Sequence, residues 1–438
     1  MNQRPTRVRY VVLAFAWMLS MVTYLDRVCF GQVAPLLAGE LSVPNLKWAF
    51  TAFTLAYAIF EIPSGWLGDA WGPRSALLRI VIWWSACTAL TGLVGLNFAS
   101  FTFGGLATLV TLRFLFGMGE AGAYPNIARV LHNWFPTDQS AIAQGWVWMS
   151  GRLMGGLTPL IWTLLVAGTA WTAPLVSWRW AFALFGLIGV LWCAAFAAFF
   201  RDHPRNHQLV NDAERIRIEH GRETGEASHT SVPVRDFLRS GNLWRLCLMY
   251  FCMNYGWYFN ITYLPSYLQE RFQTDPHSIL GAIFQGGPLL LGAISCLLGG
   301  FLVDWLIRRT GNRRRTRQYV GMAAESLCAL GWLAAIFAPN ANWFFLAISL
   351  AAMFNDLTLP NAWATCQDIG QRYTAVTAAC MNTIGTLGAV TANLLTGTIG
   401  YNRSFITFAV AYLISALCWR YIDCNKPIID TPQPATTT

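Results

Sequence analysis

The chain contains twelve long apolar segments separated by short clusters of charged or turn-forming residues, and this pattern limits what it can fold into. Each segment is long enough to cross about 30 Å of hydrocarbon as a helix that rises about 1.5 Å per residue. We therefore expect an all-α membrane protein with twelve transmembrane helices. The segments lie at residues 9–38, 46–69, 75–97, 100–127, 139–168, 176–200, 243–270, 277–307, 317–338, 342–363, 373–400 and 402–423.

The composition excludes a soluble protein of this length. Hydrophobic residues make up 55% of the 438 residues and charged residues only 12%. A soluble globular domain carries about 25% charged residues, so this chain could not cover a water-exposed surface. A soluble enzyme, a disordered protein and a collagen-like fibre are ruled out.

The basic residues predict how the chain is oriented in the membrane. The net charge is +9, with 30 lysines and arginines, and most of them fall in the termini and in loops on one side. By the positive-inside rule, both termini and the large central loop should be cytoplasmic, in the cell (inner) membrane. Because these charges are spread over loops and form no single patch, we expect no nucleic-acid partner. The opposite side carries Lys47, Arg179, Arg271 and Arg403.

One polar stretch divides the chain into two halves. Residues 201–242 are rich in charge and could form one amphipathic helix near 211–223. We expect an N-terminal six-helix bundle at 1–200, a cytoplasmic linker at 201–242, a C-terminal six-helix bundle at 243–423 and a cytoplasmic tail at 424–438.

The two halves share a loop pattern that indicates an internal repeat. The second span ends in Gly65-Trp-Leu-Gly-Asp69 and the eighth in Gly300-Phe-Leu-Val-Asp304, and basic residues follow both. A parallel repeat of six spans is typical of transporters. We expect two bundles related by a pseudo-two-fold axis.

Several charged residues fall within the apolar segments. Each costs roughly 2.5–3.5 kcal/mol at mid-bilayer on insertion scales, so each needs a partner or a polar cavity. Buried ion pairs could serve packing alone, but the first-half cluster favours a cavity for substrate and protons. The roles of Glu61, Glu325 and Asp356 stay open between structural and functional, and Glu61 is expected near the cytoplasmic end, paired with a loop arginine. The full set is Asp26, Arg27, Glu61, Arg113, Glu120, Arg152, Glu325 and Asp356.

Arg113 and Glu120 lie seven residues apart on one span. They project from nearly the same helix face, about 10 Å apart along the axis, so each needs a partner from another helix. The obvious partners are Asp26 and Arg27. If an arginine exchanges its carboxyl partner for a substrate carboxylate, the released acid can take up a proton. This arrangement predicts proton coupling.

Arg152 lies among small residues, in Ser150-Gly-Arg152-Leu-Met-Gly155-Gly156. Small residues let helices approach closely, and a guanidinium can bind a carboxylate through two hydrogen bonds. The alternative is an arginine that extends to the membrane interface.

A glycine spacing like that of a dinucleotide-binding fingerprint occurs in Gly117-Met-Gly119-Glu-Ala-Gly122. No strand precedes it, so the structural context that the fingerprint requires is missing. Its glycines should instead allow helix contact and local bending. No phosphate-binding loop and no metal-ligand spacing is present. We therefore expect no cofactor, no metal and no enzymatic activity.

The chain resembles the major facilitator superfamily of transporters. The run from Gly65 to Arg74 is similar to the superfamily's loop motif, and the Asp304 loop resembles its second copy. The resemblance implies that these residues form a gate that holds one face closed. The gate residues are Gly65, Asp69, Gly72, Arg74, Gly300 and Asp304.

Within this superfamily the chain resembles the anion:cation symporter branch, which includes sugar-acid transporters. The stretches that carry this resemblance are Tyr24-Leu-Asp26-Arg27, Arg113 to Pro125, Tyr263-Leu-Pro265-Ser-Tyr267-Leu, Trp363 and Asn382-Thr-Ile-Gly385.

The resemblance implies roles for individual residues. Asp26 and Glu120 would carry protons and Arg113 would modulate them. Arg27 would bind the substrate carboxylate, and the other substrate-binding candidates are Tyr24, Tyr57, Arg152, Trp363 and Asn382.

The sequence departs from the branch at several of its positions. Arg152 stands where members carry an uncharged polar residue, and Glu61 where the branch often has Gln. Ala375 and Ala379 replace glycines before Asn382. A second arginine in the pocket would suit a dicarboxylate or a larger acidic ligand.

The expected function is proton-coupled symport of a small organic anion by alternating access, with the chain as a monomer in the bilayer. An alternative is organic-phosphate exchange in the same fold, but span seven has no arginine between Arg245 and Arg271 to match those exchangers. A membrane-embedded sensor or enzyme is a further alternative.

Overall fold

A computed structural model describes residues 4–44, 46–98, 101–102, 104–167, 173–219, 233–274 and 279–429. The predicted linker and tail lie partly outside these residues, at 220–232 and 430–438. Within the described part, the linker contains helix α8 (Asp212–Glu219), where one amphipathic helix was predicted, and a short helix α9 (Val234–Arg239).

The first half of the chain forms six helical segments. They are α1 (Val8–Glu40), α2 (Lys47–Trp71), α3 (Pro73–Thr91), the broken pair α4 (Leu106–Glu120) and α5 (Ala123–Trp134), α6 (Ser140–Trp162) with a π turn at Thr163–Ala167, and α7 (Trp178–Phe199). Two residue pairs, β1 (Asn97–Phe98) and β2 (Phe101–Thr102), form a small antiparallel ribbon between α3 and α4, which the sequence pattern did not predict.

The second half repeats this arrangement with six more segments in the described residues. They are the interrupted run α10 (Gly241–Trp257), α11 (Phe259–Thr262) and α12 (Leu264–Phe272), then α13 (Ile279–Thr310), α14 (Arg313–Ile336), α15 (Ala341–Gly370), α16 (Thr374–Ile399) and α17 (Tyr401–Tyr421). Short 3-10 turns lie at Thr137–Gln139, Pro204–Asn206 and Gln371–Tyr373.

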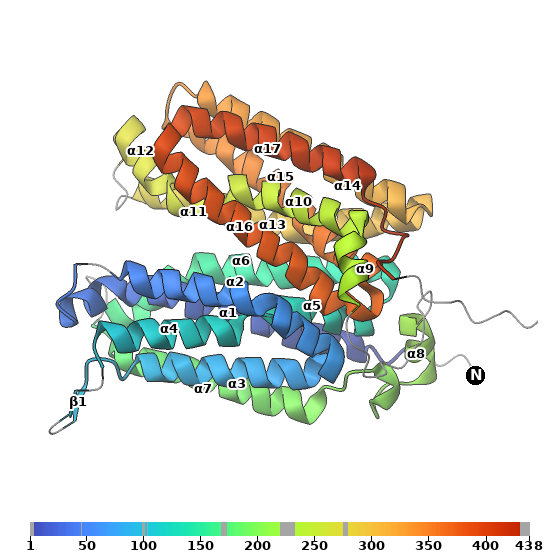
Figure 1. The fold of residues 1–438 in the computed structure, drawn as a ribbon, viewed down its shortest axis with the longest axis horizontal. Helices are drawn as coiled ribbons and strands as arrows, with labels where there is room; N and C mark the ends of the chain where they lie inside the picture. The colour runs from blue at the N-terminus through green and yellow to red at the C-terminus, as the bar shows by residue number, and fades with distance from the viewer. Residues whose placement is uncertain are drawn as a thin grey trace, which may run out of the picture.

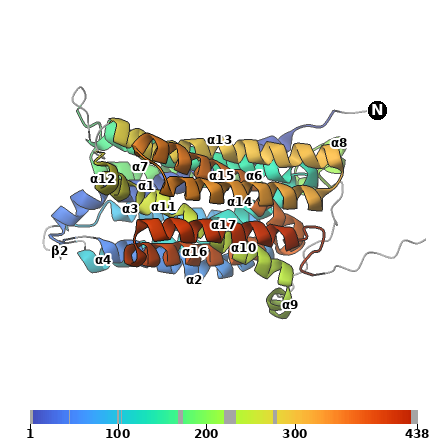
Figure 2. The same cartoon turned by 90° about the horizontal axis from the view of Figure 1, so that it is seen from above.

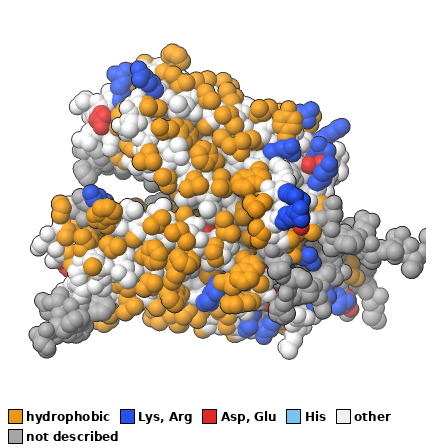
Figure 3. Space-filling view, viewed as in Figure 1, with side chains coloured by type: hydrophobic (Ala, Val, Ile, Leu, Met, Phe, Trp, Pro, Cys, Tyr) orange, Lys and Arg blue, Asp and Glu red, His pale blue; other side chains and the backbone are white. Residues whose placement is uncertain are grey.

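Seven helical stretches in the described part of the chain are long and apolar enough to cross a membrane by length and composition. They are Val8–Glu40, Leu106–Trp134, Trp178–Phe199, Ile283–Thr310, Arg313–Ile336, Ala341–Ile399 and Tyr401–Tyr421, the sixth of which contains both α15 and α16. Figure 3 shows apolar side chains over much of this face of the molecule, between its two ends.

The helices lie side by side in two groups (Figure 1). Helices α1 to α7 form the lower group and α10 to α17 the upper one, and the second view shows the same long, roughly parallel packing (Figure 2). Helices α2 and α6 of the first half contact α16 and α13 of the second. These two seams are the most extensive contacts between the halves in the described residues, and α5 and α6 also contact α16 and α15.

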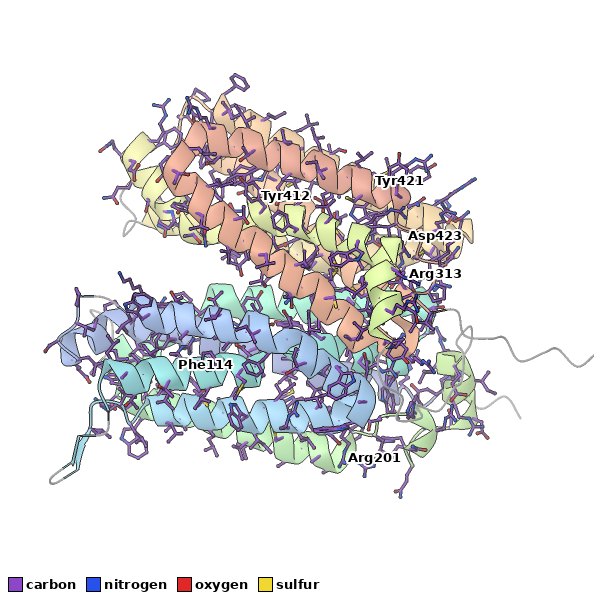
Figure 4. The ribbon with its side chains drawn as sticks, in the orientation of Figure 1. Phe114, Arg201, Arg313, Tyr412, Tyr421 and Asp423 are labelled. Carbon is purple, nitrogen blue, oxygen red and sulfur yellow. The ribbon has the colours of Figure 1, made fainter. Side chains whose placement is uncertain are left out.

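The two ends of the molecule differ. The start of α1 and the end of α17 lie at the same end, which we call the terminal face, and basic side chains gather there (Figure 3). Figure 4 places Arg201 in the lower half and Arg313, Tyr421 and Asp423 in the upper half at this end. At the opposite end, which we call the far face, the surface is hollowed between the two halves (Figure 3).

Candidate functional site

The fourth segment is broken beside its charged residues. Helix α4 ends at Glu120, and Gly122 has a φ of 88°, a left-handed conformation that favours glycine. The helix then restarts as α5. The predicted bend in this glycine-rich run is present, and it places Glu120 at the end of α4, where it can reach α1.

Glu120 pairs with Arg27, as the sequence led us to expect. The Nε of Arg27 donates to Glu120 Oε1 at 2.9 Å, and Glu120 is fully buried. Arg27 also lies over the ring of Tyr57 at 4.8 Å and near that of Phe53. Its side chain is 27% exposed. Arg27 can therefore meet both a buried acid and a ligand.

Asp26 and Arg113 complete the first-half cluster. Thr88 donates to Asp26 Oδ2 at 3.5 Å, and the guanidinium of Arg113 lies 3.9 Å from the ring centre of Phe30. Both charged side chains are buried. Aromatic faces attract a cation, so Arg113 keeps its charge near Asp26 and Glu120 while its guanidinium stacks on a ring.

Four buried polar atoms of this cluster have no hydrogen-bond partner within the described structure. Such atoms are uncommon and require an explanation, such as a water, a proton or a ligand. Two of them are carboxyl oxygens, and two are guanidinium nitrogens. They are Asp26 Oδ1, Glu120 Oε2, Arg27 Nη2 and Arg113 Nε.

Arg152 pairs across the two halves. Its Nε and Nη2 donate to the two oxygens of Asp356 on α15, both at 3.0 Å. Its Nη1 donates to the hydroxyl of Tyr24 on α1 at 3.0 Å. The guanidinium also lies 3.9 Å from the ring of Trp257. Arg152 is buried, so it does not extend to an interface.

The glycines near Arg152 allow this approach, as predicted. A Cβ on Gly151 would lie 2.7 Å from the ring of Tyr24, and one on Gly156 would lie 3.1 Å from Leu290 of the other half. Helices α1 and α13 therefore pack closely against α6. This contact brings Tyr24 within reach of Arg152.

The expectation that Glu61 pairs with a loop arginine near the cytoplasmic end is wrong. Glu61 is fully buried and accepts from Asn382 Nδ2 at 2.6 Å and from Thr383 Oγ1 at 3.1 Å. Both partners lie on α16 of the other half. Sequence pattern could not show this, because the partners are more than 300 residues away. The predicted candidate Asn382 thus contacts Glu61 in this structure.

Trp363 lies in an aromatic layer that spans both halves. Tyr124 stacks on Trp148 at 4.5 Å, and Trp148 lies 5.1 Å from Trp363. The indole N–H of Trp363 donates to the hydroxyl of Tyr250 at 3.1 Å. Sequence reasoning named only Trp363 of these four, since aromatic residues within apolar spans give no distinguishing signal.

The loop residues named by sequence join the halves at the terminal face. Asp69 accepts from the backbone N–H of Ala375 and Val376, at 3.1 and 2.8 Å, at the start of α16. Asp304 accepts from the backbone N–H of Ala141 and Ile142, at 3.3 and 2.7 Å, at the start of α6. Negative charge at a helix N-terminus is stabilising.

Two glycines let the same helices approach. A Cβ on Gly65 would lie 2.8 Å from Ala379 Cβ, and one on Gly300 would lie 2.5 Å from the carbonyl oxygen of Ala141. Each glycine stands four residues before its aspartate, on the same helix face. Close backbone contact and helix capping thus coincide at both seams.

Gly72 and Arg74 make their contacts within the first half and with the start of the linker. Gly72 has a φ of 85° and separates α2 from α3. The backbone N–H of Arg74 donates to Asp202, and its guanidinium donates to the carbonyl of Ala197 at 2.6 Å. These contacts fix the α2–α3 turn against the end of α7.

Glu325 lies apart from this cluster. It is fully buried on α14, and neither of its carboxyl oxygens has a hydrogen-bond partner in the described structure.

A family model described as the Major Facilitator Superfamily matches residues 16–392. The chain belongs to this superfamily. It is therefore a multi-pass membrane protein, and the expected all-α fold with twelve helices is confirmed.

Relatives of known or assigned function support the predicted branch. The chain is 30% identical to a probable sulfoacetate transporter of Cupriavidus necator, over 99% of this chain and 97% of that one. It is 27% identical to a hexuronate transporter of Bacillus subtilis, over 92% and 90%. It is 26% identical to a D-galactonate transporter of Escherichia coli, over 95% and 96%. The resemblance to organic-anion transporters is confirmed.

Solved structures share the fold. The proton:xylose symporter XylE matches with a TM-score of 0.73 at 14% identity, covering 94% of this chain and 96% of that one. The transporter FucP, in its outward conformation, matches with a TM-score of 0.69 at 14% identity, covering 95% and 100%.

Proposed function

We propose that the chain carries a small organic anion across the membrane together with protons, by alternating access between its two halves. The observation that carries the proposal is the cluster of Arg27, Glu120, Asp26 and Arg113, with unpartnered polar atoms on all four. The relatives, a probable sulfoacetate transporter, a hexuronate transporter and a D-galactonate transporter, support an acidic substrate.

Charge balance supports proton coupling. Three guanidiniums at the centre of the molecule face four buried carboxyl groups. If all are ionised, the cluster already has excess negative charge, and an entering anion adds more in a medium that screens poorly. Protons on the carboxyl groups would offset it. The groups are Arg27, Arg113 and Arg152 with Asp26, Glu61, Glu120 and Asp356.

The Arg27–Glu120 pair provides the coupling step. When Arg27 binds the substrate's acid group, Glu120 loses its counter-charge while it stays buried. An unpaired buried carboxylate is costly, so Glu120 takes up a proton. Asp26, which has a free Oδ1 nearby, is the second proposed carrier. Arg113 holds positive charge beside both acids.

The contacts between the halves support alternating access. We propose that the bundles 1–200 and 243–423 move as units and that the structure is open toward the far face. The Asp69 and Asp304 contacts then form the closed gate at the terminal face. The basic residues there predict that the terminal face is cytoplasmic, and we expect a monomer in the inner membrane.

The test is uptake by the purified protein in proteoliposomes. Sulfoacetate, galactonate and a hexuronate are the first substrates to examine, with and without an inward proton gradient. The wild type should accumulate one of them only with the gradient. Glu120→Gln should abolish gradient-driven accumulation but keep counterflow of substrate. Glutamine cannot take up or release a proton, whereas the arginine that binds the anion is unchanged.

A matched control is Glu40→Gln, a carboxyl that is 40% exposed and pairs with Arg179 away from the cluster. This variant should accumulate substrate as the wild type does. Net uptake by the wild type that does not depend on the proton gradient would contradict proton coupling.

A further inference from the structure

Arg152 and Asp356 form an ion pair between the two halves, near the middle of α6 and α15. Two hydrogen bonds of 3.0 Å join them, and both residues are buried. This is the geometry in which a guanidinium binds any carboxylate, whether it belongs to the protein or to a ligand. The pair therefore has the form of an occupied acid-binding site.

The Arg152 pair is adjacent to the Arg27 site. Tyr24, whose hydroxyl accepts from Arg152, lies three residues before Arg27 on α1, so both face the same side of that helix. Tyr258, between α10 and α11, lies beside Trp257, whose ring stacks on Arg152. The two guanidiniums are therefore linked through Tyr24 on this side of α1.

Each of these two guanidiniums is now neutralised by a carboxyl group of the protein. Arg27 makes one hydrogen bond to Glu120 and leaves Nη2 unpartnered, whereas Arg152 makes two to Asp356. A ligand with one acid group can replace only one of these carboxyl groups, and Glu120 is the one whose arginine is partly exposed. A ligand with a second acid group can replace Asp356 as well, without leaving either arginine unpaired.

Asp356 keeps a fixed partner if Arg152 turns to a ligand. Asn355 Nδ2 donates to Asp356 Oδ1 at 2.9 Å. The hydroxyl of Tyr412, which lies among the helices of the upper half (Figure 4), donates to Asn355 Oδ1 at 2.9 Å and fixes the orientation of that amide. Arg152 can therefore change partners while Asp356 stays in place, and Asp356, which then lacks its counter-charge, takes up a proton as Glu120 does.

We propose that Asp356 occupies, in the empty transporter, the place of a substrate's second acid group. The substrate is then a small dianion with an acid group at each end, such as a dicarboxylate or a sulfocarboxylate. One end binds Arg27 and the other displaces Asp356 from Arg152, which breaks the link between α6 and α15. The inference rests on the proposed function, because it assumes that Arg27 binds an organic anion.

The experiment compares matched ligands that differ by one charge. Sulfoacetate and succinate are dianions, and their monoamides keep nearly the same shape with one acid group fewer. Binding to the purified protein is measured by calorimetry. The wild type should bind each dianion at least about tenfold more tightly than its monoamide, as expected for the loss of a charged hydrogen-bonded pair.

The variant Arg152→Gln alone could fail to fold, since it leaves Asp356 buried without its counter-charge. The double variant Arg152→Gln with Asp356→Asn removes both charges together. It should bind the dianion no better than the monoamide.

Three results would overturn this inference and leave the proposed function standing. The first is a wild type that binds dianion and monoamide equally, and the second is a wild type that binds only monoanionic sugar acids. The third is a double variant that keeps the preference for the dianion. A wild type that binds no organic anion would overturn both proposals.

Discussion

Asp69 and Asp304 hold equivalent positions in the two halves, and each caps a helix of the opposite half. The carboxylate of Asp69 accepts the first backbone N–H groups of α16, and that of Asp304 accepts those of α6. The pseudo-two-fold relation between the halves therefore extends to individual hydrogen bonds. The same contacts join the halves, so this repeat combines the capping of two helices with the contact between the halves.

Asp69→Ala should expose the start of α16 to solvent. The backbone N–H groups of Ala375 and Val376 would lose their acceptors, and hydrogen bonds to a charged group contribute about 1.5–3 kcal/mol each. Hydrogen exchange at these two amides, followed by mass spectrometry, should accelerate by about tenfold or more.

The mirror variant Asp304→Ala is the control for this prediction. It should accelerate exchange at Ala141 and Ile142 at the start of α6. Unchanged exchange at Ala375 in Asp69→Ala would show that the carboxylate does not protect that helix end.

Gly300→Ala should prevent close packing at the α6–α13 seam. Its Cβ would lie 2.5 Å from the carbonyl oxygen of Ala141 and 2.8 Å from Ile142 Cα, and backbone atoms cannot move aside easily. Overpacking of this kind typically costs about 1–3 kcal/mol. Transport should fall strongly and the melting temperature should drop. Gly286→Ala, on the same helix with no atom within 4 Å of its new Cβ, should do neither.

Glu61→Gln should keep transport, and Glu61→Ala should lose it together with stability. A glutamine oxygen can still accept from Asn382 and its amide can donate to Thr383, so the link between α2 and α16 survives. Alanine leaves both partners unsatisfied at a cost of about 1–3 kcal/mol each. Melting temperature and counterflow measure the two effects. Loss of counterflow in Glu61→Gln would instead indicate that the charge itself is needed.

Trp363→Phe should weaken substrate binding several-fold if the aromatic layer forms the floor of the site. The smaller ring leaves space beside Trp148, while Tyr250→Phe removes only the hydroxyl that accepts from the indole N–H. We expect Tyr250→Phe to bind substrate within about twofold of wild type, by calorimetry, because it leaves no cavity. Equal loss of affinity in both variants would assign the effect to the hydrogen bond.

The sequence predicts the membrane fold because the length and hydropathy of each segment decide, without reference to the rest of the chain, whether it can cross the bilayer. A run of apolar residues that can cross the bilayer must form a helix there, since backbone polar groups find no water in lipid. Glu120 shows the limit of this reasoning. The glycines around it predicted a bend, but only the structure shows that α4 ends at Glu120 and that α5 restarts after Gly122.

The sequence also determines that charged residues within the spans need partners, because an unpaired charge in hydrocarbon is costly. For Arg27 and Glu120 the partner could be predicted from the short set of candidates. For Glu61 the prediction failed, and for Arg152 and Asp356 no pairing could be chosen. Only the tertiary structure decided these contacts, because they depend on how helices from opposite halves pack. Packing between segments that are far apart in the chain produces no periodic pattern in the sequence.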